Sequence, residues 1–170
     1  MENQVNISAE VSFIWKTAET IRDTYKPHQY QDIILPFVVL RRIESVLLEE
    51  RQKVEEKSKG SLQKLSTSDA KHIISTKVKA LIGFDNKSKF TFKLLSSEKD
   101  TAIKENFKSY VNGFSDNIKK ILERFGILKE LNKLEEDKLL YPLIKQYAEL
   151  DLSPSVVTNQ KMGYIFEEVF

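Results

Sequence analysis

The 170-residue chain has no cysteine, five glycines, four prolines and two histidines. Without cysteine it has no disulfide, zinc-thiolate site or thiol nucleophile, which is typical of a reducing compartment. The glycines stand at positions 60, 83, 113, 126 and 163, so no two lie closer than 13 residues. The phosphate-binding loops G-x-G-x-x-G and G-x-x-x-x-G-K-[ST] require clustered glycines. Both common kinds of nucleotide site are therefore excluded from these residues.

Other catalytic patterns are also missing. His28 and His72 are 44 positions apart and cannot form a helical metal pair such as H-E-x-x-H. The nucleophile elbow G-x-S-x-G is absent. A catalytic site built from carboxylates that are far apart in the sequence leaves no local motif, so a single sequence does not reveal it. We expect no catalytic, cofactor-binding or metal-binding residue in this chain alone.

Long hydrophobic runs are missing too. The longest nearly apolar run, Ile33–Leu40, contains Pro36 and is far shorter than the roughly 18 residues of a membrane span. The first residues include Glu2 and no apolar stretch of signal-peptide length. We expect no membrane partner and a cytoplasmic location. With 41% hydrophobic and 31% charged residues, the chain should form one globular domain over residues 1–170.

Apolar residues recur at spacings of three and four along most of the chain, which predicts helices. The first stripe runs from Ile7 to Tyr25. Trp15 and Tyr25 lie on this stripe and are interpreted as core residues. The second runs from Tyr30 to Ser58 and is apolar nearly all round in its first half, which places it in the middle of a bundle. Further helices are expected over 69–82, 97–113, 115–126, 127–138, 139–150 and 160–170.

Two stretches between these helices lack the periodicity. Lys57–Ser68 is polar with one glycine and is predicted as a long loop. Phe84–Leu95 is irregular, with a short extended piece expected at Phe90–Phe92. The fold class is therefore all-α, an irregular bundle of about seven helices with at most a minor strand near residues 90–92.

Positive charge is concentrated in the middle of the chain. The formal net charge is +2, but residues 61–120 carry 12 lysines and 6 acidic residues, a net charge of +6. Three lysines alternate there with three phenylalanines: Lys87, Lys89 and Lys93 with Phe84, Phe90 and Phe92. Such alternation occurs where a basic loop meets a nucleic acid. The alternative is a solvated surface over packed phenylalanines, which composition alone favours because the pI of about 8.6 is only mildly basic.

Arg41 and Arg42 follow the apolar run. Such a pair usually forms a solvated turn of helix that contacts carboxylates such as Glu44 or Glu49. It could instead hold a phosphate or an acidic partner.

Two blocks of residues resemble a known family. The first comprises Phe13-Ile14-Trp15, Tyr25-Lys26-Pro27, Tyr30, Asp32, Ile34-Leu35-Pro36 and Leu40-Arg41-Arg42. The second comprises Asp151-Leu152-Ser153-Pro154 and Met162-Gly163-Tyr164-Ile165-Phe166-Glu167-Glu168. Together they resemble the N-terminal helical domain of the modification (M) subunit of type I restriction-modification systems. The second block is similar to the junction before that family's methyltransferase domain.

The resemblance implies a parent enzyme that transfers a methyl group from S-adenosylmethionine to the N6 of adenine in a bipartite DNA target. Its complex joins two M subunits with one specificity subunit and, in the restriction form, an ATP-dependent translocase and nuclease subunit. The family's N-P-P-[YF]-type segment and cofactor loop are absent here and are expected after Phe170. The resemblance therefore assigns no catalytic or S-adenosylmethionine-binding residue to this chain.

For this piece the resemblance implies a domain that helps to enclose DNA and to distinguish hemimethylated from unmethylated targets. The DNA-facing candidates are Lys87, Lys89, Lys93, Arg41 and Arg42, because phosphate contacts need exposed basic groups and no base-reading code. The alternative is a docking module for the specificity subunit that does not touch DNA. A third hypothesis, an independent helical enzyme, predicts turnover by these residues alone.

Overall fold

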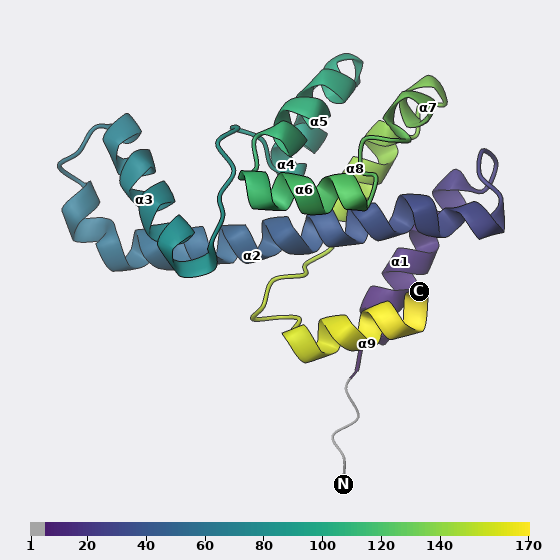
Figure 1. The fold of residues 1–170 in the computed structure, drawn as a ribbon, viewed down its shortest axis with the longest axis horizontal. Helices are drawn as coiled ribbons and strands as arrows, with labels where there is room; N and C mark the ends of the chain where they lie inside the picture. The colour runs from purple at the N-terminus through teal and green to yellow at the C-terminus, as the bar shows by residue number, and fades with distance from the viewer. Residues whose placement is uncertain (1–5) are drawn as a thin grey trace, which may run out of the picture.

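The computed structural model describes residues 6–170, in which all regular elements are helical (Figure 1). These residues form nine α-helices, seven of them with seven or more residues, which confirms the predicted all-α bundle. The elements are α1 (Ser8–Ile21), η1 (Pro27–Gln29), α2 (Tyr30–Leu62), α3 (Thr67–Ile82), α4 (Phe92–Ser97), η2 (Asp100–Ala102), α5 (Ile103–Asn112), α6 (Asp116–Arg124), α7 (Leu131–Glu136), α8 (Leu140–Ala148) and α9 (Asn159–Val169), where η marks a short 3-10 segment.

Helix α2 is the axis of the molecule. Its 33 residues correspond to about 50 Å, and in Figure 1 α4 to α7 lie on one side of it and α9 on the other. Ile33, Phe37 and Leu40 are at most 2% exposed, which confirms the predicted central position. The Phe37 ring lies 5.9 Å from that of Phe107 in α5 and 5.4 Å from that of Tyr147 in α8, centroid to centroid. The core therefore joins α2, α5 and α8 through aromatic contacts.

The predicted loop over Lys57–Ser68 is much shorter in the structure, where only residues 63–66 are non-helical. Helix α2 continues through Gly60 to Leu62, and α3 begins after Ser66, whose hydroxyl accepts a hydrogen bond from the amide of Asp69. Packing against α3 stabilises the end of α2, which offsets the cost of about 1 kcal/mol for a glycine in a helix. Gly83 ends α3 with a positive φ of 83°, as its position predicts.

The end of α2 and all of α3 form a hairpin that projects from the body, at the left of Figure 1. We call residues 49–82 the arm. Its buried side chains are Val54, Ser58 and Val78. Leu81 is 64% exposed because α3 packs along α2 and has no second layer over its other face.

Three further expectations need correction. Trp15 is 46% exposed, because it lies at the flank of a stripe whose centre is taken by Ile14 and Ala18. The predicted strand at Phe90–Phe92 is absent: Thr91 is extended, with φ −133° and ψ 169°, but it caps α4, which begins at Phe92. The helix expected over 97–113 begins only at Ile103, as α5, because Ser97 is the last residue of α4.

Candidate functional site

The basic middle of the chain folds as an irregular segment that leads into α4. The three phenylalanines of the alternating pattern, Phe84, Phe90 and Phe92, are buried, whereas Lys87, Lys89 and Lys93 are exposed. We call residues 84–93 the lysine platform. The alternation thus separates an apolar underside from a basic outer surface, and its rings are not available for stacking on bases.

Arg51 of α2 holds the platform from below. Its Nη2 donates hydrogen bonds to Asp85 Oδ1 at 2.6 Å and to the carbonyl of Asn86 at 2.7 Å, and its Nε reaches the same Asp85 oxygen at 3.1 Å. Asp85 is buried and the Arg51 side chain is 28% exposed, so this ion pair is partly shielded from water. The platform is thereby tied to the central helix at the base of the arm.

The turn between α5 and α6 holds the platform from the side. The Asn86 side-chain amide donates to the carbonyl of Tyr110 at 2.9 Å, and the amide of Lys87 donates to the carbonyl of Gly113 at 2.8 Å. The amide of Ser115 donates to the carbonyl of Asp85 at 3.0 Å. The platform's backbone is therefore fixed on two sides, and its lysines project from a rigid base.

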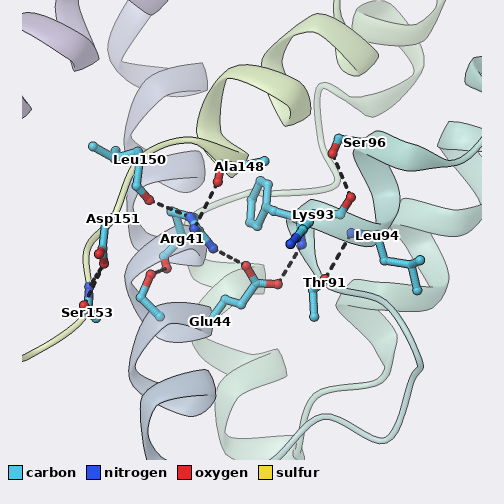
Figure 2. A network of polar contacts seen from close by, with 12 residues as sticks. Arg41, Glu44, Thr91, Lys93, Leu94, Ser96, Ala148, Leu150, Asp151 and Ser153 are labelled. Carbon is cyan, nitrogen blue, oxygen red and sulfur yellow. Dashed lines mark hydrogen bonds and ion pairs between the residues drawn. The ribbon is translucent and has the colours of Figure 1, made fainter. Parts of the chain in front are cut away.

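A buried carboxylate fixes the start of α4 (Figure 2). Glu44, which is 2% exposed, accepts hydrogen bonds from the amide of Phe92 at 2.8 Å and from the Tyr110 hydroxyl at 2.9 Å, and it pairs with Arg41. Burial raises the pKa of the Glu44 carboxyl above its ordinary value, and Arg41 acts in the opposite direction. Glu44 thus joins α2, α4 and α5 at one point in the core.

Arg41 and Arg42 are not the exposed pair that the sequence suggests. Arg41 donates to the carbonyls of Leu150 at 2.8 Å and Ala148 at 3.3 Å (Figure 2), while its contact with Glu44 is the one predicted. Arg42 donates to three oxygens farther along the chain, those of the Leu152 and Val157 carbonyls and of the Asn159 side chain. Burial lowers the pKa of the Arg42 guanidinium from its ordinary value. Both arginines hold residues 149–158, which we call the strap, on α2.

A family model described as the HsdM N-terminal domain matches residues 11–146. The chain belongs to this family. HsdM N-terminal domains are found in the M subunits of type I restriction-modification systems, so the predicted resemblance is confirmed. No curated protein and no solved structure matches the chain significantly.

The match to the HsdM N-terminal domain includes the lysine platform and both arginines but ends before the strap and α9. Arg41 and Arg42 therefore connect the matched body of the domain to the segment that follows it. Within residues 6–170, no three His, Asp or Glu side chains are placed to hold a metal ion. None of the helices described is long and apolar enough to cross a membrane.

Sequence reasoning missed the residues that support the platform of this HsdM N-terminal domain. Arg51 lies 34 positions before Asp85, and no local spacing connects the two. The only signal was Asp85-Asn86 one residue beyond the helix-ending Gly83, with Phe84 between them, a composition typical of a structured turn.

Proposed function

We propose that this domain holds DNA for the methyltransferase of a type I restriction-modification complex through phosphate contacts from the lysine platform. The observation that carries the proposal is a rigid segment with three exposed lysines, none of which forms an ion pair among the described residues. Phosphate contacts position DNA but read no sequence. Such a surface suits a domain that works beside a subunit that reads the target.

The rigidity of the platform supports this role. A flexible lysine loop loses conformational freedom when it binds, and this cost reduces its affinity. The hydrogen bonds from Arg51, Asn86 and Lys87 order the backbone before any ligand arrives. Lys89 also lies with its Nζ 5.1 Å from the centroid of the Phe90 ring, which restrains that side chain.

We infer that the chemistry belongs to the parent M subunit, as N6-adenine methylation with S-adenosylmethionine in its methyltransferase domain. The proposed partners are DNA, a specificity subunit, a second M subunit and, in the restriction form, the translocase subunit. We assign the DNA contact to Lys87, Lys89 and Lys93. Arg41 and Arg42 are already engaged with the strap.

The salt dependence of DNA binding tests the proposal. In the assembled modification complex, the triple variant K87E/K89E/K93E should bind DNA more weakly at low salt. The slope of log K against log salt concentration should become shallower by about three, because each lost phosphate contact removes about 0.9 from it. Binding is measured by titration of a fluorescent duplex at several salt concentrations.

A matched control is K129E/K138E/K145E, which makes the same charge change at three exposed lysines near α7 and α8. The control should leave the slope nearly unchanged. If the platform variant assembles normally and keeps the wild-type slope, or if both variants lower it equally, the platform does not contact DNA. A docking module without DNA contact would then describe the domain better.

A further inference from the structure

Charge is unevenly distributed along the arm. Residues 57–77, which we call the arm tip, carry five lysines and one acidic residue, Asp69. Residues 49–56, the part of α2 at the base of the arm, carry four glutamates, Arg51 and Lys53. The formal net charges of these two stretches are therefore +4 and −2. The lysines of the tip are Lys57, Lys59, Lys64, Lys71 and Lys77.

The fold gathers these lysines at one end of the arm. Helices α2 and α3 pack on each other and are joined by residues 63–66, so the end of α2 lies beside the start of α3. Lys77 Nζ donates a hydrogen bond to Ser58 Oγ at 2.9 Å, which places this lysine beside the last turns of α2. Lys57 is only about 8 Å from the end of α2 along the helix. The five ammonium groups are therefore confined to roughly the last 10 Å of the arm.

The lysines of the tip are open to a ligand. All five are exposed, and none of them forms an ion pair among the described residues. Among the residues of the tip, Leu65 is the only large apolar side chain that is exposed, so this surface lacks the apolar centre of a typical protein interface. A concentrated positive charge without apolar surface is complementary to a polyanion.

The distance between the arm tip and the lysine platform matches the repeat of a DNA duplex. Arg51 holds the platform at the base of the arm, and α2 ends at Leu62, about 17 Å farther along the helix. One turn of B-DNA is about 34 Å long and contains two strands, so a backbone crosses one side of the duplex about every 17 Å. In Figure 1, α3 and α4 to α7 lie on the same side of α2, with residues 84–91 between them. A duplex on the platform therefore presents a second backbone segment at the distance of the tip.

We propose that the arm tip is a second phosphate-binding surface for the DNA duplex that lies on the lysine platform. Its lysines contact phosphate oxygens as point charges and read no sequence. The tip packs only within its own hairpin, so it can follow the backbone without disturbing the body. The inference rests on the proposed function, because the duplex on the platform determines which backbone segment the tip meets.

Removal of charge from the tip tests the proposal in the assembled modification complex. The variant K57Q/K59Q/K64Q removes three positive charges and adds no repulsion toward the glutamates at the base of the arm. The slope of log K against log salt concentration should become shallower by about two to three, because each lost phosphate contact removes about 0.9 from it. Binding is measured by titration of a fluorescent duplex at several salt concentrations.

Two matched variants separate charge from structure. K57R/K59R/K64R keeps the three charges and should keep the wild-type slope. K129Q/K138Q/K145Q removes the same charge from exposed lysines near α7 and α8 and should also keep it. Because the substituted lysines of the tip are exposed and glutamine is a good helix former, circular dichroism should show wild-type thermal unfolding for both tip variants.

Site-specific photo-crosslinking identifies what the tip contacts. Leu65 is replaced by benzoylphenylalanine, and the probe should cross-link to the duplex in the assembled complex. The same probe at Leu128, an exposed apolar position near α7, should not cross-link to DNA. K57Q/K59Q/K64Q should lower the yield from position 65 by roughly fivefold or more.

The outcomes separate this inference from the proposed function. A wild-type slope for K57Q/K59Q/K64Q, a cross-link from position 65 to a protein subunit, or no cross-link at all would overturn the DNA contact of the tip and leave the platform unaffected. If K87E/K89E/K93E keeps the wild-type slope whereas the tip variant lowers it, the proposed role of the platform fails and the contact of the tip remains.

Discussion

At the scale of single residues, Arg41 and Arg42 show how adjacent side chains serve different parts of one segment. Arg41 reaches the end of α8 and the start of the strap, and Arg42 reaches the middle of the strap and the start of α9. Arginine suits this task because its planar group offers five donors and stays charged when partly buried. The pair therefore donates hydrogen bonds to backbone carbonyl oxygens of the strap and of the end of α8, which receive none from a neighbouring strand or helix turn.

Gly113 is the residue at which the lysine platform approaches the α5–α6 turn most closely. A Cβ atom there would lie 2.3 Å from Asn86 Oδ1 and 2.9 Å from the amide nitrogen of Ser88. Gly113→Ala should therefore displace the platform and lower the free energy of unfolding by about 1–3 kcal/mol. Urea titration followed by circular dichroism measures the change.

Gly163→Ala is the control for this prediction. Gly163 lies inside α9, and a Cβ atom there meets no other atom within 4 Å. The alanine should raise the free energy of unfolding by about 0.5–1 kcal/mol, because glycine loses more backbone entropy in a helix. If Gly113→Ala were as stable as the wild type, the close contact between Gly113 and Asn86 would not exist in solution.

At the scale of elements, periodicity predicted most helices but not the links between them. Gly83 ends α3, as its position indicates, because its left-handed φ is a local effect, and Gly113 is the C-cap of α5. Gly60 failed as a signal since tertiary packing on α3 outweighs its low helix propensity. The platform and the strap could not be predicted, because Arg51 and Arg42 make contacts 34 and 110 or more positions away. The candidate lysines were predicted from their charge, from their alternation with phenylalanines and from the family resemblance.

The strap is the element whose attachment depends on pH. The amide and hydroxyl of Ser155 donate to Glu49, and the hydrogen bond from the amide lowers the pKa of that carboxyl below 4.5. Hydrogen bonds from Ser153 likewise lower the pKa of Asp151 below 3.8. A carboxyl whose folded pKa is depressed stabilises the fold above its unfolded pKa and loses this contribution as the pH falls through the folded value. The strap should therefore loosen in acid, below about pH 4.5.

The pair E49Q/D151N tests this expectation. At pH 7 it should lower the free energy of unfolding by about 1 kcal/mol, since hydrogen bonds to charged acceptors are lost. The difference from the wild type should shrink as the pH falls below about 4.5, where the wild-type carboxylates also become protonated. Glu50→Gln changes a charge on the same helix without touching the strap and is the control. A difference that stays constant down to pH 3 would contradict the assignment.

At the scale of the whole molecule, the body and the arm differ in how much apolar surface they bury. The body has an aromatic core that includes Phe37, Phe107 and Tyr147, all at most 2% exposed. The arm buries Val54, Ser58 and Val78, and Lys77 donates a hydrogen bond to Ser58 at 2.9 Å between its two helices. Its base is fixed by Arg51, but its tip packs on nothing except itself. Local stability should therefore decrease from the base of the arm to its tip.

Native-state hydrogen exchange should show this gradient directly. Amides of α3 should exchange by a local opening with a lower free energy than those of α5 and α8, which exchange only when the body unfolds. Val78→Ala removes the single buried side chain of α3 and should lower the opening free energy of the arm by about 1–3 kcal/mol, with little effect on α5 and α8. Equal protection of α3 and α5, or a loss of protection in both with Val78→Ala, would mean that arm and body unfold as one unit. Because Arg51 lies at the base of the arm, an opening confined to the tip leaves the lysine platform in place, so the DNA contact proposed for the platform does not depend on the tip of the arm.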